Sequence, residues 1–153
     1  MSHDVEVSKV VQKLAFNGLA HPSLRLALKK ILLASFIVGA QSAVAVSFQD
    51  AGENILYFEH ARLSAEHCER RGVPARSAFQ TWMQENLTLH HQSNQSIRAR
   101  AADGGLSKAD QELVLRASTD NQRRLAQDHI SKKGVNCGDF KGVLNMYSTL
   151  LKK

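Results

Sequence analysis

Residues 24–45 constrain the fold of this chain more than any other stretch, because they combine the three parts of a secretory signal peptide. Basic residues cluster at 25–30, an apolar run covers 31–40, and Ala43 and Ala45 are the small residues that a signal peptidase accepts just before a cut. When such a segment is removed at a membrane, only the residues that follow it build the fold. The sequence therefore predicts an exported protein, located in the periplasm or outside the cell.

Two other interpretations of the apolar segment stay open. The uninterrupted run is about 10 residues long, whereas a membrane-spanning helix needs roughly 20. Counting on to Phe48 brings it close to that length, so an uncleaved anchor is one alternative. A buried helix of a cytosolic protein is the other, although such a helix does not need Lys29 and Lys30 at its start. In the preferred interpretation the chain meets the membrane only through its leader, during export.

Residues 1–23 form an upstream extension that a leader does not need, since leaders normally begin within a few residues of their first Met. Either the start of translation is assigned too far upstream, or this stretch is a short cytosolic tail. We expect it to be absent from the mature protein, which is then a single helical domain over 46–153. These 108 residues are enough for one small hydrophobic core.

The charge of the mature segment argues against a nucleic-acid partner. The whole chain has a formal charge of +6, but 46–153 contains fifteen basic and twelve acidic residues and carries only +3. Basic pairs such as Arg70-Arg71 and Lys132-Lys133 fall near expected helix ends, where cations interact favourably with the helix dipole. A nucleic-acid surface would gather these charges on one face.

Cys68 and Cys137 are the two cysteines of the chain, and both lie in the mature segment. In an oxidising compartment such a pair favours a disulfide. The spacing excludes a C-x-x-C redox motif and a C-x-x-C-H haem attachment site. We therefore expect a Cys68–Cys137 bridge, and no cofactor.

Apolar residues recur at helical spacing through the mature segment, and glycine and proline mark the boundaries. Ser107 with Asp110 resembles a capping box, and Asn136 with Asp139 can cap the last helix. The sequence predicts an all-α fold with four helices, over about 50–71, 75–102, 107–133 and 136–151.

Short connections between four helices favour an up-down four-helix bundle closed by one disulfide. The cysteines agree with this order, because the end of the first helix and the start of the fourth lie at the same end of such a bundle. Cys68 and Cys137 occupy these two places. In addition, the second and third helices are longer than the others, so the hairpin tip at 92–115 is expected to project unless the middle helices kink.

The projecting tip is the candidate partner-binding site. It is polar and rich in alanine, and it presents Gln92, Gln95, Arg98 and Arg100. The alternative is a solvated hairpin with no partner, or one covered by the N-terminal segment. No arrangement of serine, histidine and acidic residues indicates catalysis, and the bridge leaves no thiol nucleophile, so we expect no enzyme activity.

Histidines provide an alternative site, for a metal ion. His60, His67 and His90 lie on the first two expected helices, and bundle cores can bind metals through side chains of facing helices. Against this, no two histidines have the i, i+4 spacing that lets one helix supply two ligands to one ion. We regard a metal site as the weaker hypothesis.

Together these features predict a small exported helical protein that acts by binding another protein. Its partner would be an unidentified envelope or secreted protein, and an inhibitor or immunity-type role in the periplasm suits the size and the lack of catalytic groups. Homo-oligomerisation stays open. The alternative is a periplasmic helical bundle that binds or senses a metal.

Overall fold

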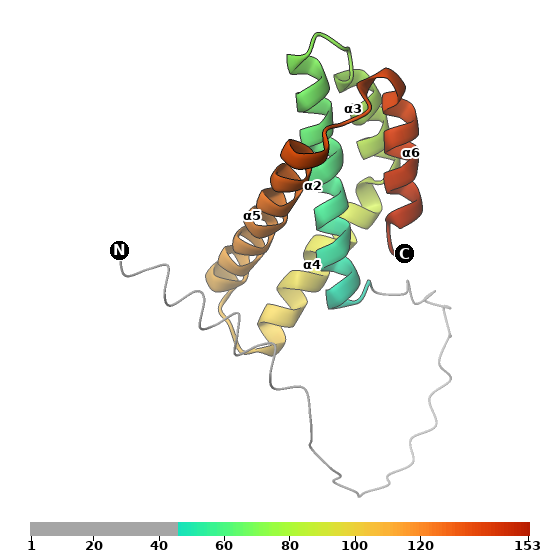
Figure 1. Cartoon of the computed structure of the whole chain (residues 1–153). Helices are drawn as coiled ribbons and strands as arrows, with labels where there is room; N and C mark the ends of the chain where they lie inside the picture. The colour runs from blue at the N-terminus through green and yellow to red at the C-terminus, as the bar shows by residue number, and fades with distance from the viewer. Residues whose placement is uncertain (1–45) are drawn as a thin grey trace, which may run out of the picture. The chain divides into compact units, whose positions relative to one another are not determined.

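The computed structural model describes residues 46–153, and within this range the chain is all-helical, with five α-helices and no strand (Figure 1). The predicted leader and the upstream extension lie outside the described residues. The elements are α2 (Phe48–Arg70), α3 (Arg76–Glu85), α4 (Leu87–Asp103), α5 (Lys108–Lys133), the short 3-10 helix η1 (Cys137–Asp139) and α6 (Phe140–Leu150).

Side-chain caps begin three of these helices. The hydroxyl of Ser47 accepts from the backbone N–H of Asp50 at the start of α2. Ser107 accepts from Asp110 N–H at the start of α5, as its spacing predicts. Asp139 accepts from Gly142 N–H and begins α6. Each cap satisfies a backbone donor that the first turn leaves without a partner.

The prediction of one continuous helix over 75–102 is wrong, because the helix is interrupted at Asn86, between α3 and α4. The Asn86 side-chain amide donates to the carbonyl oxygen of Trp82 at 2.8 Å. Asparagine competes in this way with the backbone hydrogen bonds of a helix. The break allows α3 to contact α2 and α6, while α4 contacts α2 and α5.

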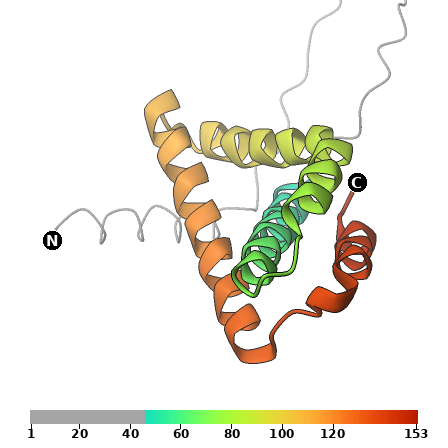
Figure 2. The same ribbon diagram turned by 90° about the horizontal axis from the view of Figure 1, so that it is seen from above.

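Helix α2 lies in the middle of the domain and contacts α3, α4, α5 and α6 (Figure 2). Its small residues Ala51, Ala61 and Ala65 are buried and allow the neighbouring helices to approach closely. The large apolar side chains buried in the core are Ile55 and Phe58 of α2 itself and, from the other elements, Trp82, Leu89, Ile97, Leu115, Phe140, Leu144, Tyr147 and Leu151.

A disulfide joins Cys68 near the end of α2 to Cys137 at the start of η1, which confirms the predicted bridge. The two Cα atoms are 5.4 Å apart. A disulfide is characteristic of an oxidising environment outside the cytosol. None of the helices in the described range is long and apolar enough to cross a membrane.

The C-terminal end of α6 is held by a buried asparagine of α2. Asn54 Nδ2 donates to the carbonyl oxygen of Lys152 at 2.8 Å, and Lys152 N–H donates to Asn54 Oδ1 at 2.7 Å. Asn54 Nδ2 also donates to Ser93 Oγ of α4. The Asn54 side chain of α2 thus connects the segment after α6 to α2 and α4.

Candidate functional site

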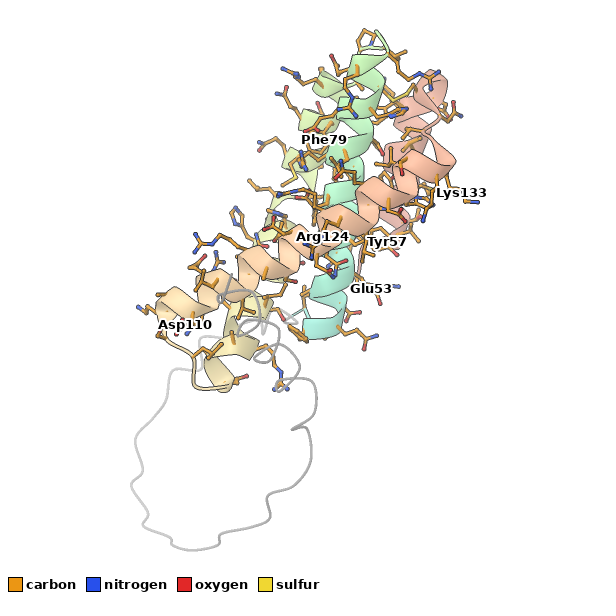
Figure 3. The ribbon with its side chains drawn as sticks, turned by 60° about the vertical axis from the view of Figure 1, so that its left-hand side comes forward. Glu53, Tyr57, Phe79, Asp110, Arg124 and Lys133 are labelled. Atoms are coloured by element: carbon orange, nitrogen blue, oxygen red, sulfur yellow. A yellow bond between two sulfur atoms is a disulfide. The ribbon has the colours of Figure 1, made fainter. Side chains whose placement is uncertain are left out.

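Helices α4 and α5 form an arm of two helices that spread apart from a tightly defined turn (Figure 2). Gly105 has a φ of 80°, a conformation that favours glycine, and its N–H donates to Ala102 O. The N–H of Leu106 donates to Ala101 O, which completes a Schellman motif at the end of α4. In Figure 3, α5 crosses in front of α2, from Asp110 at the turn to Lys133 at its other end.

An ion pair connects the two helices of the arm near this turn. Arg98 Nε lies 2.5 Å from Glu112 Oε1, and Arg98 Nη2 lies 3.2 Å from Glu112 Oε2. The hydrogen bond from Arg98 lowers the pKa of Glu112 below its usual value. This two-point contact connects α4 and α5 near the tip.

A pocket of about 310 Å³ opens where this arm covers α2. Its floor is apolar and consists of Ile55, Phe58 and Leu115. Its rim is polar and is contributed by all three helices: Glu59, His90, Asn94, Arg116, Thr119, Asp120 and Arg123. We call this pocket and its rim, together with the Arg98–Glu112 pair, the α4–α5 face.

The charges on the rim largely neutralise one another. Glu59 has only 12% of its side chain exposed and accepts from both Arg62 of α2 and Arg123 of α5. Arg123 also donates to Asp120 at 2.9 Å. With Arg116 included, two acidic and two basic side chains line the pocket, so it favours a ligand group without a net charge.

His90 and Asn94 bring hydrogen-bonding groups to the pocket. The His90 ring packs edge-on against Phe58, with ring centroids 4.8 Å apart. The pKa of His90 is lowered mainly by burial and, to a smaller extent, by the charge of His91. The carboxylate of Glu59 raises it but does not cancel these effects. The imidazole is therefore neutral at pH 7 and can both donate and accept. The Asn94 amide makes no hydrogen bond to another residue of the described range, so it too is available to a ligand.

The four predicted partner-binding residues do not share one side of α4. Arg98 points toward α5 and pairs with Glu112. Arg100 is two positions further on, which places its side chain about 200° around the helix. Gln95 is exposed and Gln92 partly buried. Of the four, Arg98 alone belongs to the α4–α5 face.

The spacing of His90, Asn94 and Arg98 was a signal in the sequence for this face. Residues at i, i+4 and i+8 lie along one edge of a helix. By contrast, Glu59 and Arg123 are separated by 64 residues. No sequence pattern indicated that they meet.

The structure does not bring the three candidate metal ligands together. His60 lies against His129 and Tyr147, whereas His90 packs on Phe58. His67 has a buried Nε2 with no hydrogen-bond partner in the part of the chain that the structure describes. In that same part, no group of three histidine, cysteine or acidic side chains is spaced to bind a metal ion.

No family model matches the chain, and neither a curated protein nor a solved structure matches it. Its function is therefore inferred from its own geometry. The α4–α5 face offers an apolar floor, a balanced charged rim and unused hydrogen-bonding groups.

Proposed function

We propose that residues 24–45 export the chain and that 46–153 acts in the periplasm, or outside the cell, by binding another protein through the α4–α5 face. In this proposal the domain is an up-down four-helix bundle, whose second member is α3 and α4 together. The observation that carries the proposal is the pocket between α2, α4 and α5, with its apolar floor and polar rim.

Protein interfaces concentrate their binding energy in a few large side chains that enter pockets of this kind. Phe58, Ile55 and Leu115 would contact the apolar part of such an anchor. His90 and Asn94 would hydrogen-bond to its polar part. Because the rim has no net charge, the anchor is best an uncharged aromatic residue with a polar atom, such as tyrosine or tryptophan.

The arm is also fixed in shape before any partner arrives. The Schellman turn, the Arg98–Glu112 pair and the Glu59–Arg123 pair each restrict how α4 and α5 lie on α2. A surface that is ordered in advance loses little conformational entropy on association. This suits an inhibitor or immunity-type protein, which must bind one target tightly.

The test is retention of an envelope protein by variants of the face. Thr119→Trp fills the pocket and Arg116→Glu reverses a rim charge, and we expect each to weaken retention of the wild-type partner at least tenfold. Asn121→Trp is the matched control, since Asn121 is exposed on the far side of α5, two positions from Thr119. Equal retention by all three variants, with unchanged circular dichroism, would exclude this face as the docking site.

Export has its own test. N-terminal sequencing of the protein recovered from outside the cytosol is expected to begin at Val46. The intact chain in the cytosol, with Cys68 and Cys137 both open to alkylation, would contradict the proposal.

A further inference from the structure

Helix α6 is attached to the rest of the domain by a disulfide before its start, and by polar contacts along its length and just after its end. The disulfide of Cys68 and Cys137 holds the segment that leads into α6, and Asn54 binds the backbone of Lys152 just after it. On one side, Trp82 Nε1 of α3 donates to Ser148 Oγ at 2.7 Å. Under the centre of α6 lies His60 of α2.

The central contact is a buried cluster of three polar side chains. His60 and Tyr147 are only 8% and 7% exposed, and Ser64 is fully buried. The Tyr147 hydroxyl lies 3.3 Å from Ser64 Oγ and 3.5 Å from His60 Nδ1. On the other side of His60, the ring of His129 from α5 packs edge-on with centroids 5.0 Å apart.

Nothing in this cluster stabilises a positive charge on His60. The titratable groups that face it are His129 from α5 and Tyr147 from α6. No carboxylate of the described residues contributes to its environment, and α3 and α4 contribute no titratable group. On α2 itself, His67 is two turns away. Burial, and then the charge of His129, lower the pKa of His60 to about 4.

We propose that His60, His129 and Tyr147 form an acid-sensitive latch that releases α6 from α2 when His60 is protonated. A buried imidazolium without a counter-ion is strongly unfavourable, and release of α6 hydrates it. The disulfide keeps the released helix attached to the domain at its beginning. The face of α6 that release would uncover is largely apolar, because Leu144 and Tyr147 of α6 and the following Leu151 are buried in the core cluster of the closed form. This latch does not depend on the proposed partner or on the α4–α5 face.

The sign of the pH effect follows from linkage. In the open form His60 titrates near its ordinary value of 6.5, and in the closed form near 4. The open form therefore binds more protons, and the closed form loses stability as the pH falls from about 6.5 to about 4. A shift of this size raises the opening equilibrium constant up to about 300-fold. Below pH 4 the effect saturates.

The test uses Trp82, the only tryptophan of the chain, because its indole binds α6. In a titration from pH 7 to pH 3, we expect Trp82 fluorescence to change while far-ultraviolet circular dichroism keeps most of its helical signal. Amide exchange, corrected for its intrinsic pH dependence, is expected to lose protection in α6 before α4 and α5.

Variants show whether His60 is responsible. His60→Gln removes the titrating group and is expected to abolish the fluorescence change above pH 4. His129→Gln, a milder change at an exposed residue, removes the neighbouring charge that lowers the pKa of His60. The pKa of His60 in the closed form then rises, and the acid-induced opening is expected to be smaller than in the wild type. His91→Gln, an exposed histidine of α4, is the control and is expected to behave as wild type.

Three results would overturn the latch. The first is a wild-type titration in which fluorescence and circular dichroism change together, as in global unfolding. The second is an unshifted transition in His60→Gln. If His60→Gln does not fold, nuclear magnetic resonance titration of the His60 ring in the wild-type protein is the alternative test. An ordinary pKa near 6.5 for that ring is the third result that would contradict the latch.

Discussion

Asn54 is a fully buried residue whose side-chain amide nitrogen and oxygen both form hydrogen bonds. Its amide pairs with both backbone groups of Lys152 and donates a second hydrogen bond to Ser93 of α4. Ser93 Oγ in turn donates to the carbonyl oxygen of Leu89. A buried amide is tolerated only when its hydrogen bonds are satisfied. Here they are satisfied by the backbone of the segment that follows α6.

This arrangement predicts a large effect for Asn54→Ala. The variant loses the pairing with Lys152, leaves Ser93 without this donor and creates a small cavity beside Ile55. We expect a loss of about 2–3 kcal/mol in the free energy of unfolding. Urea denaturation followed by circular dichroism measures it, and Asn145→Ala, at an exposed position of α6, is the control. A loss below about 0.5 kcal/mol would mean that the Lys152 contact does not stabilise the fold.

At the scale of elements, the ends of the helices were predictable and the break at Asn86 was not. Gly72 and Gly134 adopt positive φ angles of 76° and 72° where helices end, and the sequence marks both places with glycine. Ser107 caps α5 at the predicted position, whereas α6 is capped by Asp139, three residues after the predicted Asn136, which makes no side-chain cap. These signals are local, so one sequence is enough to find them.

Asn86 has no such signal around it, because asparagine occurs in helices without breaking them. The break goes together with two different packings: α3 packs against α2 and α6, and α4 against α2 and α5. The start of α3 depends on a contact of the same kind. The Glu69 carboxylate accepts from Ala75 N–H at 2.6 Å and Arg76 N–H at 2.7 Å, and these bonds lower its pKa. In the sequence, Pro74 indicated that a helix begins near residue 75, but nothing indicated that Glu69 caps that helix.

In the candidate site, too, the sequence predicts the features that depend on neighbouring residues and not the contacts between distant ones. His90, Asn94 and Arg98 share one edge of α4, which helical spacing predicts. The pocket they border exists only because Glu59 of α2 meets Arg123 of α5. Contacts between residues far apart in sequence depend on how helices pack, and periodicity does not specify that packing.

At the scale of the whole molecule, α2 is the element on which all the others depend. It contacts each of the other four α-helices and contributes the polar groups that hold α6. Val46, just before α2, and Leu151, just after α6, are both buried in the same core cluster as α2. The disulfide adds a covalent connection at the opposite end of α2, across a sequence separation of 69 residues.

A connection across so long a loop restricts the unfolded chain strongly. In the chain-entropy model a loop of this length is worth about 4 kcal/mol, a large part of the stability of a small domain. We therefore predict that the double variant Cys68→Ala with Cys137→Ala loses about 3–5 kcal/mol in the free energy of unfolding. Urea denaturation measures this loss, with reduced wild-type protein as the matched control, since reduction opens the bridge without changing either side chain to alanine. Both should unfold at similar urea concentrations, well below the oxidised protein. Equal stability of the oxidised and reduced wild type would show that packing on α2 holds η1 and α6 in place without the bridge.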